Sequence, residues 1–284
     1  MPVQSLVLLV TLAALWGGSF VFMRVAVHAL GPIPLTFARV VMAALFLCAI
    51  AYTQRQLPNW RSQWRSYLVV GLVNSAIPFV LFCFAALYIT ASTAAVLNAT
   101  SPFFVALAAA LWLSEPLTAR KIAGMLIGLA GVVLLVGWHP EAMSVDVMLA
   151  IAACLVAALC YALASVYVKR RMHNVPSLAL ASGSQVVAAL ALAPMLPLTT
   201  IPGPMTLVVA LNVLALAVAS TGLAYIIYFK LIADVGPSRA MTVTFLIPLF
   251  GVLWGFLFLD EVLTINMLAG GSLIVAGTAI AVRK

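Results

Sequence analysis

The feature that most constrains this chain is a succession of apolar runs, each about 20 residues long, separated by short connections. A run of that length is enough for one helix to cross the hydrocarbon core of a bilayer. Only 7% of the residues are charged, whereas a soluble domain carries about 25%. We therefore predict an all-α integral membrane protein that is embedded in the lipid bilayer. The ten predicted transmembrane helices cover residues 4–23, 33–53, 66–87, 92–113, 120–137, 146–168, 176–197, 206–229, 238–258 and 264–282.

The basic residues indicate how these spans are oriented. The net charge is +8, but Lys and Arg are concentrated in the short connections, which is a topology signal and argues against a nucleic-acid partner. We predict a multi-pass protein of the inner (plasma) membrane with both termini cytoplasmic. Twelve of the 14 Lys and Arg residues then lie inside: Arg55, Arg61, Arg65, Arg120, Lys121, Lys169, Arg170, Arg171, Lys230, Arg239, Arg283 and Lys284. No basic residue precedes the first run, so we expect a span there and not a secretory signal peptide.

The groups that catalysis or metal binding would need are missing from the middle of the spans. Asp and Glu occur only at span ends, and neither an HExxH nor a GxSxG motif is present. Cys48, Cys83, Cys154 and Cys160 lie in apolar runs without metal-ligand spacing, and we interpret them as small buried hydrophobic residues. We predict no enzyme activity, no cofactor and no metal site.

The second half of the chain repeats the first in one unbroken register. Each repeat holds five predicted spans, an odd number, so two copies in series must be embedded in opposite senses. We place the repeats at residues 1–141 and 142–284. The repeated glycines predict close helix packing within the bundle, with a dimer contact as the alternative. A shift of 146 residues superposes Pro102 on Pro248, Glu115 on Glu261, Thr118 on Thr264, Gly124 on Gly270 and Gly131 on Gly277.

This inverted arrangement favours a transporter. Glu115 is expected on the cytoplasmic side of the membrane and Glu261 on the external side. Inverted repeats are typical of secondary transporters, which open a central site alternately to the two faces. A passive channel is the weaker alternative, because channel filters usually need oligomeric rings or carbonyl loops. The oligomeric state is not readable from the sequence, and a monomer is compatible with it.

The repeated motifs resemble those of the drug/metabolite transporter superfamily, in particular its ten-span EamA-type exporters. The resemblance covers nearly the whole chain. It implies a ten-helix basket with a central cavity between the repeats and export of small metabolites, with amino acids, including aromatic ones, prominent in the most similar branch. The residues that carry it are Trp16-Gly17-Gly18-Ser19-Phe20, Ala38-Arg39, Ser101-Pro102, Glu115-Pro116-Leu117-Thr118, Ile247-Pro248 and Asp260-Glu261-Val262-Leu263-Thr264.

Polar and aromatic side chains recur at matching positions of the repeats. Positions 75, 79 and 82 are expected to share one helical face, as are their counterparts 221, 225 and 228. We predict that such stripes line a cavity, where rings stack on a partly apolar substrate and hydroxyls and amides bind its polar end. Helix packing is the alternative. The candidate substrate-binding residues are Trp16, Ser19, Asn74, Ser75, Phe79, Phe82, Asn98, Ser101, Tyr161, Ser165, Ser220, Thr221, Tyr225, Tyr228 and Thr244.

Arg39 and three prolines need explanations of their own. Arg24 at the end of span 1 can reach the external surface, but Arg39 lies deeper in span 2. It is predicted to bind a substrate carboxylate near the outer mouth or to pair with an external acid. Pro78, Pro102 and Pro248 lie inside spans and predict helix bends, which are either gates or static kinks.

The substrate class follows from what the spans lack. No Lys or Arg is expected in the middle of the cavity, which argues against phosphorylated substrates and favours uncharged or zwitterionic ones. Drugs and nucleobases are the alternative to amino acids. Proton-coupled carriers often use a membrane-embedded carboxylate, and none is predicted here, so we expect facilitated export or exchange.

Overall fold

The computed structural model describes residues 2–114, 116–136, 144–235 and 243–282. These residues form helices and no strand, which confirms the all-α class. Helices are expected because backbone groups in lipid must find hydrogen-bond partners within the protein, and a helix satisfies them within one segment. The predictions for Glu115, Arg239, Arg283, Lys284 and the repeat boundary at 141/142 lie outside the described residues.

Seven helical stretches among the described residues are long and apolar enough to cross a membrane. They match predicted spans 1–4 and 6–8. The other three predicted spans match the shorter helices α7 (Ala119–Val136), α13 (Val243–Leu259) and α14 (Ile265–Val282). The count of ten crossings stays a prediction. The seven stretches are Val3–Leu30, Pro32–Thr53, Trp60–Ala85, Ala91–Leu113, Val145–Arg171, Ser177–Leu198 and Leu207–Tyr228.

Several of these stretches are built from more than one helical element. The elements outside α7, α13 and α14 are α1 (Val3–Leu30), α2 (Pro32–Thr53), α3 (Trp60–Val70), η1 (Gly71–Ala76), α4 (Ile77–Ala85), α5 (Ala91–Asn98), α6 (Ser101–Leu113), α8 (Val145–Arg171), α9 (Ser177–Leu192), η3 (Ala193–Leu198), α10 (Leu207–Leu214), η4 (Ala215–Leu223) and α11 (Ala224–Val235).

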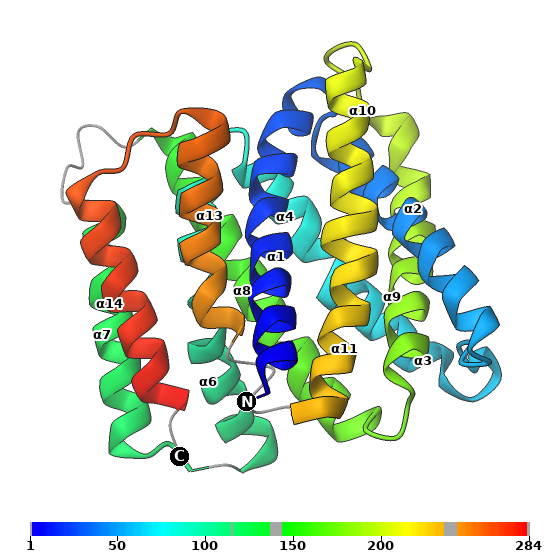
Figure 1. Ribbon diagram of the computed structural model, residues 1–284, viewed down its shortest axis with the longest axis horizontal. Helices are drawn as coiled ribbons and strands as arrows, with labels where there is room; N and C mark the ends of the chain where they lie inside the picture. The colour runs from blue at the N-terminus through cyan, green and yellow to red at the C-terminus, as the bar shows by residue number, and fades with distance from the viewer. Residues whose placement is uncertain (1, 115, 137–143, 236–242, 283–284) are drawn as a thin grey trace.

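The helices form one bundle whose two ends can be told apart by the connections they carry. The start of α1 and the end of α14 lie at the same end, together with the connection from α6 to α7 (Figure 1). The connection from α13 to α14 lies at the opposite end (Figure 1). Helices α7 and α14 run antiparallel, side by side, at one edge of the bundle.

Two helix boundaries differ from the prediction. Helix α1 runs on to Leu30, so Arg24 lies within it, and its side chain donates to the Ala86 carbonyl after α4 instead of only reaching for the surface. The chain turns at Gly31, whose φ of 79° favours glycine. Helix α3 begins at Trp60, so this residue lies in the first helical turn and not in a connection.

Two stretches contain π-helical segments at matching positions of the repeat. Segment η1 spans Gly71–Ala76, and η4 spans Ala215–Leu223. Pro78 follows η1 in the first turn of α4, whereas the second stretch has Ala224 after η4 and no proline. The π segments therefore do not depend on proline. They widen the helix to an i→i+5 pattern, which shifts every later side chain around the axis.

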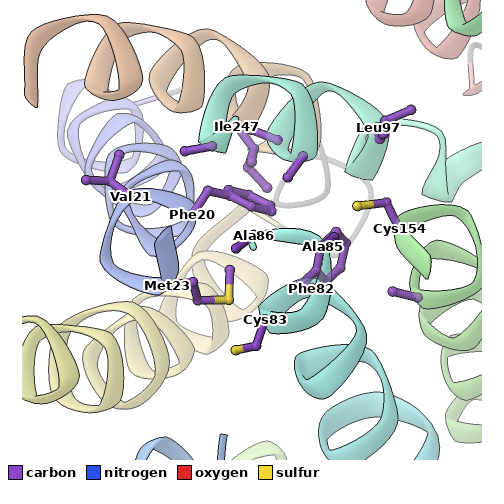
Figure 2. Packing of buried hydrophobic residues seen from close by; sticks show 14 of the residues in the cluster. Phe20, Val21, Met23, Phe82, Cys83, Ala85, Ala86, Leu97, Cys154 and Ile247 are labelled. Atoms are coloured by element: carbon purple, nitrogen blue, oxygen red, sulfur yellow. The ribbon is translucent and has the colours of Figure 1, made fainter. Parts of the chain in front are cut away.

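Apolar side chains fill the middle of the bundle. Figure 2 shows buried residues of this core, among them Phe20 of α1, Phe82 of α4 and Ile247 of α13. The rings of Phe20 and Phe82 meet edge to face, with their centroids 5.5 Å apart. Cys83 and Cys154 are buried in the same core, as predicted, whereas Cys48 and Cys160 are only partly buried.

The contact between α7 and α14 obeys the 146-residue offset. A Cβ atom added to Gly131 would lie 2.7 Å from the Gly270 carbonyl oxygen, and one added to Gly277 would lie 2.5 Å from the Gly124 carbonyl oxygen. The shift exchanges these two contacts with each other. The backbones approach so closely that any larger residue would separate the helices, so close packing within the bundle is confirmed.

Candidate functional site

A cavity of about 340 Å³ lies within the bundle and receives side chains from both halves of the chain. This volume falls within the range of about 300–1,000 Å³ that small-molecule sites usually have. The described lining residues are Trp16, Ser19, Phe20, Met23, Arg39, Val70, Asn74, Phe79, Phe82, Asn98, Ser101, Pro102, Val105, Tyr161, Ala164, Ser165, Val168, Leu180, Ala181, Ser184, Ser220, Thr221, Tyr225, Tyr228, Val243, Thr244 and Ile247.

The cavity gathers nearly all of the predicted binding residues, although their role in binding a substrate stays a prediction. Only Ser75 among the candidates does not line the cavity. The candidates that do are Trp16, Ser19, Asn74, Phe79, Phe82, Asn98, Ser101, Tyr161, Ser165, Ser220, Thr221, Tyr225, Tyr228 and Thr244. They come from stretches far apart in sequence that the bundle brings around one space.

Ser75 departs from the predicted stripe. Its side chain is fully buried, and its oxygen accepts a hydrogen bond of 3.0 Å from Nε2 of Gln185 on α9. The prediction assumed regular α-helical spacing from Ser75 to Phe79 and Phe82. Ser75 lies in η1 and faces α9, whereas Phe79 and Phe82 line the cavity. Its counterpart Thr221 lies in η4 and does line the cavity.

Aromatic rings from both halves form walls of the cavity. Trp16 and Tyr228 contact each other with their ring centroids 5.4 Å apart, and Phe82 and Tyr161 stack with an angle of 22° between their planes. Each pair joins a residue of the first half to one of the second. Such contacts hold the rings in place, so that they offer flat apolar surfaces to a substrate without further ordering.

Three of the lining serine hydroxyls donate their protons to the backbone. Ser19 donates to the carbonyl of Trp16, Ser101 to that of Asn98, and Ser220 to that of Leu15. A hydroxyl has one proton and two lone pairs. These three groups can therefore offer a substrate only acceptor capacity, which suits an ammonium or another N–H group.

Arg39 lines the cavity, and its place near the outer mouth stays a prediction. Its side chain is 5% exposed, and its guanidinium carbon lies 3.6 Å from the centroid of the Phe79 ring. Nε donates to Thr221 Oγ1 over 3.0 Å, and Nη1 donates to the Met23 sulfur over 3.7 Å. No carboxylate of the described residues pairs with it, so the predicted pairing with an external acid is not seen there. The sequence predicted a cavity without Lys or Arg, and this prediction was wrong because Arg39 lines it.

The hydrogen bond of Arg39, which joins the two halves, has a counterpart under the repeat offset. The repeat offset of 146 residues takes Arg39 to Gln185 and takes Ser75 to Thr221. Arg39 donates to Thr221, and Gln185 donates to Ser75, each over 3.0 Å. The two bonds are exchanged by the offset, and each ties a helix to a π segment. Sequence inspection did not single out Gln185, although this register with Arg39 marks it.

The three prolines lie in different settings. Pro102 lines the cavity in the first turn of α6, directly after the interruption at Ala99 and Thr100. Pro78 starts α4, and Pro248 lies inside the continuous helix α13. Neither of these two is among the lining residues. The role of the prolines as gates stays a prediction.

Two further residues were missed by the sequence reasoning. Met23 follows Trp16 and Ser19 on one α-helical stripe, so the i, i+3, i+7 spacing could have found it. Glu261, predicted only as a topology marker, accepts hydrogen bonds from the backbone N–H groups of Ala91 (2.7 Å) and Ser92 (3.0 Å). Its carboxylate thus caps the positive N-terminal end of α5 and joins the two halves.

Comparison with known proteins identifies relatives along nearly the whole chain. The model of the EamA-like transporter family matches residues 4–137 and 148–283. An uncharacterised transporter of Archaeoglobus fulgidus is 25% identical and covers 95% of each chain. A probable amino-acid metabolite efflux pump of Salmonella typhimurium is 29% identical over 92% of this chain and 89% of its own.

One solved structure is similar in fold. It aligns with a TM-score of 0.70 over 98% of this chain and 96% of its own, at 20% sequence identity. At that identity the likeness concerns the arrangement of the helices alone.

Proposed function

The chain belongs to the EamA-like transporter family, and from that premise we propose that it exports small uncharged or zwitterionic metabolites, chiefly amino acids including aromatic ones. The observation that carries the proposal is the central cavity of about 340 Å³, which both halves line with aromatic rings and hydroxyl groups. The efflux pump of Salmonella typhimurium, named as a probable amino-acid metabolite carrier, supports the substrate class.

The proposed mechanism is alternating access by two inverted repeats, residues 1–141 and 142–284, in the inner membrane with both termini cytoplasmic. Three observations support it. The family model matches two stretches of the chain. The 146-residue offset exchanges the Arg39–Thr221 bond with the Gln185–Ser75 bond. The connection after α6 and the connection after α13 lie at opposite ends of the bundle (Figure 1).

This topology can be tested with accessibility tags. A single cysteine placed at Leu117, in a background without the four native cysteines, should react with a membrane-impermeant thiol reagent only from the cytoplasmic side. A cysteine at Leu263, its counterpart, should react only from outside. Labelling of both from a common side would contradict the inverted arrangement.

The binding roles proposed for the lining residues rest on their chemistry. Trp16, Tyr161 and Tyr228 provide ring faces for an apolar side chain. Ser19 and Ser220 provide acceptors for an amino group. A substrate with one apolar end and one polar end would thus satisfy both kinds of surface in one cavity.

Counterflow in proteoliposomes tests the substrate class. Vesicles loaded with an unlabelled compound are given the labelled form of the same compound, and a carrier accumulates the label transiently. We expect counterflow with L-phenylalanine and other amino acids, and none in vesicles without protein. Counterflow with nucleobases or drugs but with no amino acid would replace the proposal by the alternative substrate classes. Flux without counterflow would indicate a channel.

A further inference from the structure

Arg39 is a basic residue with an unusual environment for a membrane protein. It is 5% exposed and lies on α2 among side chains of the central cavity. A charge in the membrane interior is costly unless an opposite charge or several polar groups compensate it. The acceptors around Arg39 are one hydroxyl, from Thr221, and one thioether sulfur, from Met23. A thioether is a weak acceptor, so the protein compensates this charge only in part.

The geometry of the guanidinium leaves its edge available to a ligand. One flat face is covered by the Phe79 ring at 3.6 Å, which fixes the plane of the group. A guanidinium carries five N–H donors in that plane. The intramolecular bonds to Thr221 and Met23 use the donors of Nε and one of those on Nη1. Donors of the terminal nitrogens remain, in the fork geometry that matches a carboxylate.

We infer that Arg39 binds the carboxylate of the transported substrate and thereby restricts the cavity to carboxylate-bearing molecules. The inference rests on the proposed function, because it assigns a ligand to the same cavity. The surrounding groups agree with it. Ser19 lies one helical turn before Met23 and offers only acceptor capacity, so an ammonium group can be bound beside the guanidinium. Arg39 and Ser19 together complement a zwitterion.

The second half of the chain provides an internal control. Gln185 occupies the position equivalent to Arg39 and makes the equivalent bond, to Ser75. It is completely buried and does not line the cavity. A substitution at Gln185 disturbs a matching interhelical contact without touching the ligand. Effects of Arg39 substitutions that Gln185→Leu does not reproduce therefore report on the ligand and not on helix packing.

The test compares an amino acid with its amide, in which an uncharged carboxamide replaces the carboxylate. Counterflow of labelled L-phenylalanine is competed with unlabelled L-phenylalanine or L-phenylalaninamide, in the wild type, Arg39→Gln, Arg39→Lys and Gln185→Leu. We expect the wild type to prefer the acid. Arg39→Gln should lower that preference roughly 10- to 100-fold, the value of a charge-assisted hydrogen bond. Arg39→Lys should keep part of it, because the charge stays but the fork is lost.

Gln185→Leu should leave the preference for the acid unchanged. Equal competition by acid and amide in the wild type would overturn the inference while leaving amino-acid export intact. An unchanged preference in Arg39→Gln would overturn it as well.

A binding assay separates this inference from the proposed function. Thermal unfolding of the purified protein in detergent is followed with 3-phenylpropionate, with neutral 3-phenylpropionamide and with chloride. Stabilisation by the carboxylate alone, lost in Arg39→Gln, would support the inference even if no amino acid were transported. Equal stabilisation by chloride would overturn it in favour of an inorganic anion. If neither ligand stabilises the protein and no counterflow occurs, both proposals fail.

Discussion

Two equivalent hydrogen bonds join the halves of this protein with different chemistry. In one, Arg39 of α2 donates to Thr221 in η4, and in the other Gln185 of α9 donates to Ser75 in η1. The bond lengths are equal, but the environments are not. Arg39 lines the cavity, whereas Gln185 is enclosed by helices and its Oε1 atom has no hydrogen-bond partner among the described residues. The comparison teaches that the residue at this repeated position, Arg39 or Gln185, joins two helices in each case. Whether it also reaches the cavity is decided separately, by its surroundings.

The largest expected effect comes from giving the second half the residue of the first. Gln185→Arg places a charge where no cavity and no carboxylate of the described residues can compensate it. An uncompensated buried charge costs about 3–5 kcal/mol, so we expect loss of the monodisperse peak in size-exclusion chromatography. The reciprocal change, Arg39→Gln, should leave that peak intact. A well-folded Gln185→Arg protein would show that this site tolerates a charge as the first half does.

The glycine contacts provide a comparison in which the halves should agree. Gly131→Ala and Gly277→Ala each place a Cβ atom against the backbone of the opposite helix, at 2.7 and 2.5 Å. Overpacking of this kind costs about 1–3 kcal/mol. We expect similar decreases in thermal stability for the two variants, measured by unfolding in detergent. Gly271→Ala is a matched control, because its added Cβ atom would lie 3.6 Å from Val96, an ordinary contact. A large effect in only one of the first two variants would contradict the equivalence.

Removal of the hydroxyl acceptor should have different effects at the two equivalent bonds. Ser75→Ala leaves Nε2 of Gln185 without an acceptor in a closed environment, and we expect a loss of stability of about 1 kcal/mol. Thr221→Ala removes the acceptor of Nε of Arg39 at the edge of the cavity. It should change substrate affinity more than thermal stability. Unfolding temperatures and counterflow affinities of both variants test this, and the reverse pattern would break the comparison.

The smallest effect is expected from a pH gradient, because neither half contributes a carboxylate to the described cavity lining. We therefore expect that flux into proteoliposomes is the same with and without an imposed pH gradient. Vesicles made permeable to protons by an ionophore serve as the control. Strict dependence on the gradient would show that transport is coupled to a proton carried by a group outside this lining.

Much of the architecture could be predicted because the bilayer limits the choices. Apolar runs in lipid form helices, and the long helices lie where the runs predicted them. The candidate cavity residues were also predictable, since a repeated polar residue in a membrane helix marks an interior position. Thr221 was found in this way, and Phe79 and Tyr225 were found as aromatic residues at matching positions of the repeat. The helix ends were less predictable, because apolar residues continue past the core, as in α1 beyond Arg24.

The sequence by itself determined the helical class, the positions of the long helices and the pairs of residues that the two halves share. It could do so because hydrophobic length and internal repetition are properties of the chain alone. Only the tertiary structure decided that Ser75 faces α9, that Arg39 lines the cavity and that Arg39 and Gln185 make equivalent bonds in different environments. The reason is that the place of a side chain and the value of a buried charge depend on neighbours that other helices bring.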